Sequence, residues 1–499
     1  MLIDFRPHAR LRGKNAVDFG SAVTPVLDAL AASREDLSRV RVVCDWVQYR
    51  ENFRDVVDVR PVLPYRGPAG NQDGRPPTAV TPGYDMEVAV DVRRSGATTL
   101  GDLTAERLGR PHPESSRRVY LEDWALSSQS CLWDFNALYW SRLEMWEKAS
   151  GRSYEQALPG GESDARNHGA ARELIGDLFT VWDKLAADGA LPEELCVAEL
   201  GVGNGSQAKV FLDEFRVLDK AAKRGYYRRL HYVMCDYSPY VLDLARETVA
   251  AHASHVSSVA LDAMRPSTSL GFLRGRIFLL YVSNVYDNLP TDEVAQFGGQ
   301  SYFVHTRAYF PPAAAADLAA SVSAVPEQLP GLVRRLLRLG PALLADAAPA
   351  HVSDTDAAVR FWQQAWSALR LEERYVPLTG LDLYHLAPST TGEELRPLLE
   401  SGADVRMHVS NGAVASFTDT LPLLHPFGKL VCHDLFATGV QDYRVSFRGP
   451  GKYDGSVVNW VNGPLLAHVG RHRGFDVQFT PVRHRSGGNI VTMTAQPGD

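Results

Sequence analysis

The sequence predicts an α/β protein built around an open, mostly parallel sheet. A short apolar run at 196–200 ends in three closely spaced glycines, Gly201, Gly203 and Gly205, and helix-forming residues follow from position 206. A second apolar run at 230–236 ends in Asp236 and is also followed by a helical stretch, 240–249. Strands that alternate with helices in this way form parallel sheets. The core is therefore expected to be Rossmann-like, with a ligand at the carboxyl edge of its strands.

The glycine loop indicates which kind of ligand to expect. Three glycines within five residues allow the backbone to pass close to a bound molecule, and Glu199 places a carboxylate two residues before them. Their spacing departs from the G-x-G-x-x-G fingerprint, in which a helix N-terminus holds a pyrophosphate. After the second strand, Asp236 is expected to accept two hydrogen bonds from the vicinal diol of a ribose.

Taken together, E-x-G-x-G-x-G at 199–205 and D-x-S-P at 236–239 resemble the motifs of class I S-adenosylmethionine methyltransferases. The resemblance implies S-adenosyl-L-methionine as the cofactor. It also implies that an acid after the third strand, at 256–263, accepts a hydrogen bond from the adenine amino group. The residues expected to bind the cofactor are Glu199, Gly201, Gly203, Asn204, Gly205, Asp236, Tyr237, Ser238, Asp262, Ala263 and Asn284.

The rest of the chain divides around this core, which is expected to span 191–499. A fourth strand is predicted at 276–290, a fifth at 428–434, and a final hairpin from 474–479 and 489–495, the reversed ending typical of the class. Between the fourth and fifth strands, 291–425 contains leucine- and alanine-rich helical stretches at 313–324, 332–344 and 357–371. That length far exceeds an ordinary connection, so a helical insertion over the substrate site is predicted.

Two parts precede the core. Residues 1–115 contain short β-rich runs at 40–47, 55–62 and 86–92, separated by connections rich in proline and glycine, and are expected to form a β-rich accessory domain. Residues 116–190 are expected to be a helical cap and linker with many aromatic residues, ending in an amphipathic helix at 170–185. The accessory domain and the insertion are expected to form the substrate chamber and are candidates for a homodimer interface.

Composition and net charge indicate which classes of binding partner to expect. The net charge of -7 and a pI near 6.1 give no reason to expect nucleic acid or an anionic membrane. The five cysteines are scattered without a C-x-x-C pair, so neither disulfides nor a metal site is predicted. No apolar run reaches transmembrane length and the first residues lack the core of a signal peptide, so a cytoplasmic protein with a small-molecule substrate is expected.

Within the methyltransferase class, residues 165–499 look most like the MidA family, which includes the mitochondrial complex I assembly methyltransferase that modifies a protein arginine. The likeness rests on E-L-G-x-G-x-G at 199–205, D-x-S-P at 236–239 and Y-D-N-L-P at 286–290, which matches the family's F-D-A-L-P. Asn284 stands where the family has an acid before that motif. Because of its accessory domain and its arginine-rich composition, the chain also resembles a free L-arginine N-methyltransferase of the bacterial streptozotocin type.

A guanidino group as methyl acceptor would require carboxylate side chains in the site. A guanidinium group is delocalised and has a pKa above about 12, so carboxylates must hold it and accept the departing proton. The candidates are Asp287, Asp434, Glu122 and Asp123, while Tyr286, Asn459, Trp460 and Asn462 are expected to bind the substrate. The sequence leaves two alternatives open. The enzyme could methylate another small metabolite with a histidine base such as His305 or His433, or the chain could be a non-catalytic scaffold.

Overall fold

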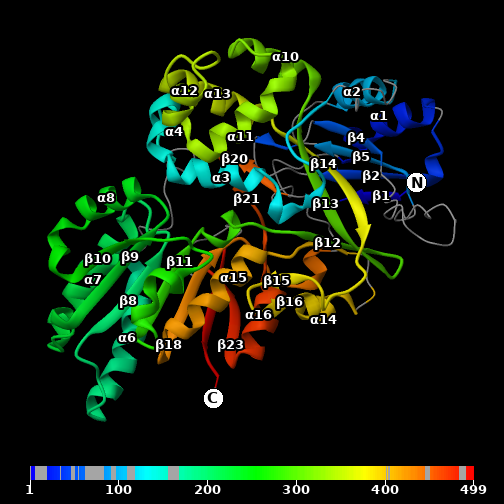
Figure 1. Ribbon diagram of the computed structural model, residues 1–499. Helices are drawn as coiled ribbons and strands as arrows, with labels where there is room; N and C mark the ends of the chain where they lie inside the picture. The colour runs from blue at the N-terminus through cyan, green and yellow to red at the C-terminus, as the bar shows by residue number, and fades with distance from the viewer. Residues whose placement is uncertain are drawn as a thin grey trace.

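The computed structural model describes residues 2–5, 19–33, 35–45, 51–53, 56–61, 84–91, 97–109, 118–154, 168–400, 402, 405–443, 450–482 and 490–498. Figure 1 shows a large sheet in the lower half of the molecule, a smaller sheet near the N-terminus, and a group of helices at the top. Among the described residues, no helix combines the length and hydropathy that a membrane crossing needs.

The large sheet has seven strands in the order β10-β9-β8-β11-β18-β24-β23. Its first five strands are parallel, and β24 runs antiparallel between β18 and the edge strand β23. The strands are β8 (Leu195–Leu200), β9 (Leu230–Asp236), β10 (Val256–Ala260), β11 (Ile277–Ser283), β18 (Leu424–Asp434), β23 (Phe475–Pro481) and β24 (Val491–Pro497). This order confirms the predicted Rossmann-like core, including its reversed ending.

Successive residues of these strands point to opposite faces of the sheet, and both sets are apolar. Helices therefore cover both faces. One core contains apolar residues of α6 (His168–Ala187), α7 (Ser206–Ala222) and α8 (Pro239–Thr248). The opposite core contains those of α9 (Pro266–Leu270), α15 (Asn411–Thr420) and α16 (Gly463–His472). The helices predicted from 206, at 240–249 and at 170–185 are therefore all present.

The N-terminal part is an α/β layer rather than a purely β-rich unit. Its sheet has the order β1-β2-β5-β4, formed by β1 (Leu2–Phe5), β2 (Val40–Asp45), β5 (Met86–Asp91) and β4 (Val57–Pro61). Two helices that the sequence pattern did not indicate, α1 (Phe19–Ala32) and α2 (Ala97–Gly109), pack on each other and contribute to the same core. The connections 62–83 and 110–117 lie outside the described residues.

The cap and the insertion form one body. Besides the expected helices α10 (Pro312–Ser321), α11 (Leu329–Leu339), α12 (Pro341–Ala347) and α13 (Thr355–Ala368), the insertion contains a sheet that was not predicted. That sheet comprises β14 (Arg370–Pro377), β13 (Gln300–Phe310), β12 (Glu293–Phe297) and β17 (Val405–His408), and cap strands β6 (Val119–Tyr120) and β7 (Ala125–Leu126) also pair with β13. Cap helices α3 (Leu132–Ser141) and α4 (Leu143–Ser150) share a core with α10–α13.

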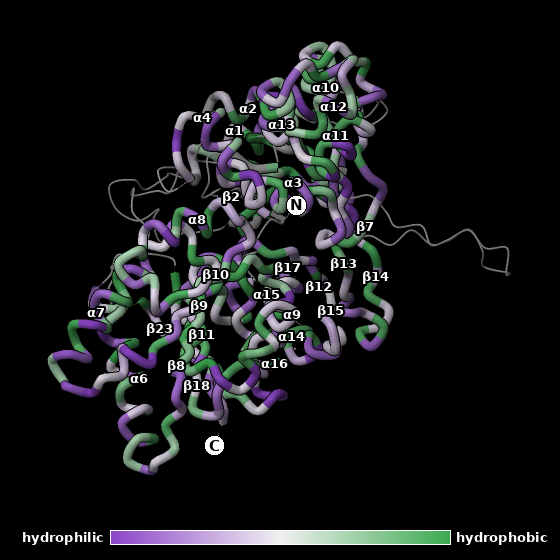
Figure 2. The backbone as a smooth tube through the Cα atoms, turned by 60° about the vertical axis from the view of Figure 1, so that its left-hand side comes forward, coloured by the Kyte–Doolittle hydropathy of each residue, from purple (hydrophilic) through white to green (hydrophobic). Residues whose placement is uncertain are grey.

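One short N-terminal segment joins this body instead of its own sheet. Strand β3 (Glu51–Asn52) pairs with β20 (Gly451–Tyr453), which in turn pairs with β21 (Ser456–Val458). The next residue, Phe53, is buried against Trp366 of α13, with ring centroids 5.4 Å apart. Phe53, on the N-terminal side of the predicted boundary at 115, thus contributes to the core of the cap and insertion, while the N-terminal sheet has a core of its own. Hydrophobic stretches occur in both the upper and lower halves of the molecule in Figure 2, in line with several distinct cores.

Candidate functional site

The three loop glycines occupy backbone conformations that other residues rarely adopt. Their φ angles are +72° at Gly201, +55° at Gly203 and +80° at Gly205. A Cβ atom on Gly201 would collide with the side chain of Val285, and one on Gly205 would lie 2.8 Å from the Cα atom of Ala245. The loop therefore requires glycine both for its turn and for the close approach of these two neighbours.

Asp236 lies against this loop, as the sequence predicts for a site at the carboxyl edge. Its Oδ2 accepts a hydrogen bond from the backbone N–H of Gly203 at 3.1 Å, and its Oδ1 accepts one from the backbone N–H of Ser238 at 3.1 Å. Burial raises the pKa of Asp236 to about 6, although these backbone donors lower it. Each oxygen retains a lone pair, so the carboxylate can still receive the two hydroxyl groups of a ribose.

Glu199 lies deeper than expected. Its side chain is 2% exposed and accepts a hydrogen bond of 2.6 Å from the hydroxyl of Tyr232 on the neighbouring strand. Burial is the main reason that the pKa of Glu199 rises to about 8. Direct contact between this carboxylate and a ligand remains a prediction.

The other residues expected at the cofactor surround the same edge. Tyr237 is 47% exposed, Asp262 is exposed, and Ala263 is partly exposed. Asn284 is exposed with a left-handed φ of +51°, and its backbone N–H donates to the carbonyl of His433 at 2.9 Å.

Two of the expected cofactor residues have local structural partners. The buried Ser238 caps α8 by accepting from the N–H of Val241, and Asn204 accepts from the N–H of Ser206 at 3.0 Å within the loop. Both side chains therefore shape the loop and helix start at this edge.

Asp287 and Asp434 are the two candidate acids that the fold brings together. Both are buried, and their carboxyl groups are hydrogen-bonded to each other at the ends of β11 and β18. Asp434 also accepts from four backbone N–H groups, including that of Tyr286 at 2.8 Å and that of Leu435 at 2.7 Å. Burial, then the Asp434 charge, raises the pKa of Asp287 well above its usual range. The two carboxyl groups therefore share about one proton, and the pair carries about one negative charge.

Glu122 and Asp123 do not join this pair. Glu122 accepts from Ser130 Oγ and the Cys131 N–H, both at 2.6 Å, and from the Ala308 N–H at 2.9 Å. These bonds fix the start of α3 against β13, which is a structural role rather than the catalytic one expected. Asp123 is exposed beside it.

Asn459 is the predicted substrate residue whose geometry best fits a ligand. Its backbone N–H and its Nδ2 both donate to the carbonyl of Asp287, at 2.8 and 3.3 Å. Its Oδ1 is shielded from solvent and has no hydrogen-bond partner among the described residues, and the same is true of Oδ1 of Asn288. Buried acceptors are normally paired, so these two amide oxygens beside Asp287 are available to accept hydrogen bonds from a ligand.

Tyr286 and Asn462 are structural, contrary to the sequence-based expectation. Tyr286 is 2% exposed and packs in the core, with its hydroxyl beside Ser416 and Thr420 of α15. Asn462 caps α16 by accepting from the N–H of Leu465 at 3.1 Å. Trp460, between these asparagines, is only partly buried, so a substrate contact for it remains a prediction.

The two histidines considered as alternative bases lie in different environments. Burial, assisted by the nearby Arg374, lowers the pKa of His305 to about 4. His433 Nδ1 lies 2.9 Å from the hydroxyl of Thr492.

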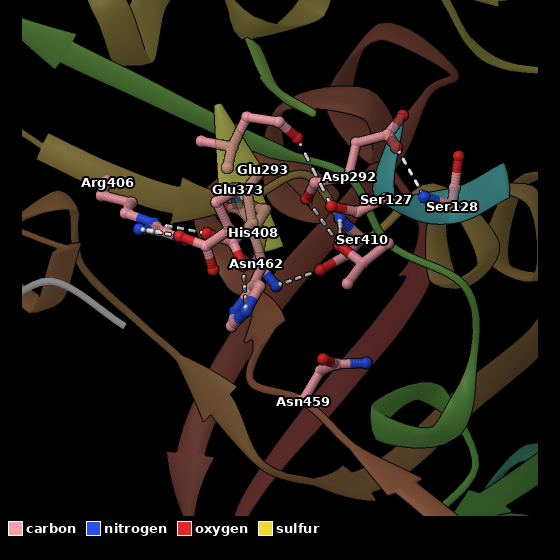
Figure 3. Close-up of polar contacts among 12 residues, drawn as sticks. Ser127, Ser128, Asp292, Glu293, Glu373, Arg406, His408, Ser410, Asn459 and Asn462 are labelled. Carbon is pink, nitrogen blue, oxygen red and sulfur yellow. Dashed lines mark hydrogen bonds and ion pairs between the residues drawn. The ribbon is translucent and has the colours of Figure 1, made fainter. Parts of the chain in front are cut away.

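A buried ionic group lies within the sheet of the insertion, where Arg406 of β17 meets one acid of β12 and one of β14, as Figure 3 shows. Arg406 contacts Glu293 at 2.5 Å and Glu373 at 3.0 Å, and all three side chains are buried. On the same strand as Arg406, the His408 carbonyl accepts from Nδ2 of Asn462 at 2.8 Å. Buried ion pairs mainly fix relative position, and these fix β17 against β12 and β14. The Asn462 hydrogen bond then holds β17 beside the start of α16.

Two side chains at the site, those of Tyr154 and Asn136, were not identified from sequence. Tyr154 places its hydroxyl against Gly203, and Asp134 lies close enough to Tyr237 to help raise its pKa. Asn136 of α3 donates to the carbonyl of Asn288 at 2.9 Å and accepts from the N–H of Val457 at 2.9 Å. They come from the aromatic cap, whose placement over the sheet no local pattern reveals.

No protein-family model matches the chain, and neither does any curated protein sequence. Among solved structures, it is similar to a Burkholderia thailandensis protein bound to S-adenosyl-homocysteine, with 14% identity and a TM-score of 0.44 over 75% of this chain and 88% of that one. It is also similar to the DszA carbon methyltransferase, with 11% identity and a TM-score of 0.32 over 74% and 67% of the two chains. A further likeness is to the CcbJ methyltransferase from Streptomyces caelestis, with 9% identity and a TM-score of 0.29 over 68% and 99%.

Proposed function

We propose that the protein is an S-adenosylmethionine-dependent methyltransferase. The observation that carries the proposal is the contact of Asp236 with the Gly203 N–H at the carboxyl edge of a seven-stranded sheet with a reversed hairpin. The acids around this edge, Asp236, Asp262 and Asp134, would attract a cofactor that bears a sulfonium and an ammonium group. The same acids would repel the pyrophosphate of a dinucleotide.

The acceptor is proposed to be a guanidino group, either free L-arginine or an arginine-like metabolite. The oxygens of Asn459 and Asn288 would accept hydrogen bonds from its N–H groups, and the negative charge shared by Asp287 and Asp434 would compensate its cation. In the reaction, a bond forms between the acceptor nitrogen and the methyl carbon while the bond from that carbon to sulfur breaks, giving S-adenosylhomocysteine. The proton lost from nitrogen passes to the carboxyl pair and then to water.

Cofactor binding is tested first, by calorimetry with S-adenosylmethionine, S-adenosylhomocysteine and NAD. We expect binding of the first two only. Binding of NAD alone would overturn the assignment as a methyltransferase.

The acceptor is tested by mass spectrometry of reactions with L-arginine and with L-citrulline, which replaces the guanidinium by a neutral urea of nearly the same shape. We expect a methylated product from arginine and none from citrulline. Turnover only on an arginine-containing peptide would favour a protein substrate, and turnover only on neutral metabolites or phenols would replace the guanidino proposal.

The roles at the acceptor are tested by substitution. Asp287→Asn should lower kcat by ~10²-fold because the pair loses one of the two carboxyl groups between which it can hold protons, while affinity for S-adenosylhomocysteine changes little. Asn459→Ala should mainly raise KM for the acceptor, because it removes a ground-state contact. Unchanged kinetics in both variants would exclude this part of the edge as the acceptor site.

A further inference from the structure

A second cluster of chemically active side chains lies away from the glycine loop, at the junction of the insertion and the core. His468 and His472 are four residues apart on α16, which places both on one face of the helix. Glu394 of the short helix η11 (Gly392–Leu395) faces them from the insertion. Its Oε2 lies 3.2 Å from Nε2 of His468 and 2.9 Å from Nδ1 of His472.

The distances suit a shared cation. The three ligand atoms all lie within 4.8 Å of one another. A tetrahedral ion holds nitrogen and oxygen ligands at about 2.0–2.2 Å, which separates neighbouring ligand atoms by roughly 3.3–3.5 Å. The observed carboxylate–imidazole separations therefore need to open by only a few tenths of an ångström to admit an ion.

The cluster is partly shielded from solvent at the side of His468, whose side chain is 22% exposed. Oε2 of Glu394 is shielded from solvent between the two rings. The cluster thus presents two imidazole nitrogens and one carboxylate oxygen, and it is accessible from the side of His472, whose side chain is 58% exposed.

We propose that Glu394, His468 and His472 bind a divalent transition-metal ion of the Zn²⁺ type. Two imidazoles and one carboxylate are a common protein ligand set for Zn²⁺, with water as the fourth ligand, whereas Ca²⁺ and Mg²⁺ prefer oxygen ligands. Because η11 belongs to the insertion and α16 to the core, the bound ion would tie the two together. Cysteine spacing could not indicate this site, since no cysteine takes part.

The other group of comparable composition among the described residues, Glu194, Cys196 and His231, fits a cation less well. Arg276 already contacts Glu194 at 3.1 Å, and Nε2 of His231 lies 2.8 Å from the hydroxyl of Ser257. An added cation would meet the guanidinium charge directly.

The experiment uses metal-free, untagged full-length protein titrated with Zn²⁺ by calorimetry and with Co²⁺ by visible absorption. We expect one tight site per chain, the intense absorption of tetrahedral Co²⁺, and a higher Tm with saturating Zn²⁺. We expect Zn²⁺ binding to weaken by about 100-fold or more in each of the variants His468→Asn, His472→Asn and Glu394→Gln. That is more than the loss of a residue that merely hydrogen-bonds a ligand would cause. His385→Asn is the matched control, because this histidine is exposed in the same insertion but outside the cluster.

Circular dichroism and S-adenosylhomocysteine binding show whether each variant is folded. Glu394→Gln keeps an oxygen that can accept from either imidazole, so it tests the charge without removing the contact. Wild-type binding that equals that of the triple variant H468N/H472N/E394Q would overturn the proposal. So would a Tm that Zn²⁺ raises equally in both proteins.

Discussion

The hydroxyl oxygen of Tyr154 lies 2.7 Å from the point that a Cβ atom on Gly203 would occupy. The cap therefore contacts the glycine loop through one aromatic side chain, and the N–H of Tyr154 in turn donates to Glu147 at 2.8 Å. Since Gly203 also donates to Asp236, any molecule that binds Asp236 at this loop lies beside Tyr154.

Gly203→Ala should reduce affinity for S-adenosylhomocysteine by about tenfold or more. The new methyl group would strain a backbone with φ of +55° and would collide with the Tyr154 hydroxyl. Calorimetry measures the loss, and the double variant Gly203→Ala/Tyr154→Phe should recover part of it because the collision is removed. Gly176→Ala in α6 is the control, because nothing outside its own helix backbone lies within 4 Å of the added methyl group. Equal affinity for wild type and Gly203→Ala would contradict the placement of the cofactor.

Asp236→Ala should cost ~1.5–3 kcal/mol of cofactor binding, or about tenfold or more in affinity, because it removes the acceptors for two ribose hydroxyls. Asp243→Ala, which removes an exposed carboxylate of α8, should leave affinity unchanged. Since burial raises the pKa of Asp236 to about 6, wild-type affinity should also fall as the pH drops below about 6. A flat pH profile would show that the charge of this group is not used.

Glu199→Gln should remove a pH dependence of stability. The pKa of Glu199 is about 8 in the folded protein against an ordinary value of 4.5, so the folded state holds a proton that the unfolded chain releases between these values. The free energy of unfolding should therefore fall as pH rises from about 4.5 to about 8. The amide introduced by this substitution remains neutral and can still accept from Tyr232, so Tm curves of the variant and wild type should separate above about pH 5. Parallel curves across this range would indicate that Glu199 is ionised in the fold.

Phe53→Ala should destabilise the cap and insertion although residue 53 lies in the N-terminal third. The ring is buried against Trp366, and removing such a side chain typically costs ~3–5 kcal/mol. Thermal unfolding should show the loss, while Phe272→Ala, which truncates a side chain that is 63% exposed, should have little effect. If Phe53→Ala unfolds like the wild type, the N-terminal segment is not part of that core.

The sequence alone determined the central sheet and the part of the site formed by the glycine loop and Asp236. The strand at 230–236 matches β9 to the residue, and the loop glycines with Asp236 converge as their spacing implies. Such features are local: a buried strand is an apolar run, a tight turn needs glycine, and parallel strands deliver their carboxyl ends to one edge.

The tertiary structure decided which polar residues are available for chemistry. Glu122 and Asp287 look alike in sequence, yet three hydrogen bonds make the first a structural residue, while the second meets Asp434 across 147 positions of chain. Likewise, Asn462 caps a helix while Asn459 keeps an oxygen without a donor among the described residues. The sheet of the insertion and the approach of Tyr154 also depend on long-range pairing. No local pattern encodes these outcomes, because each depends on which distant groups satisfy the buried polar atoms.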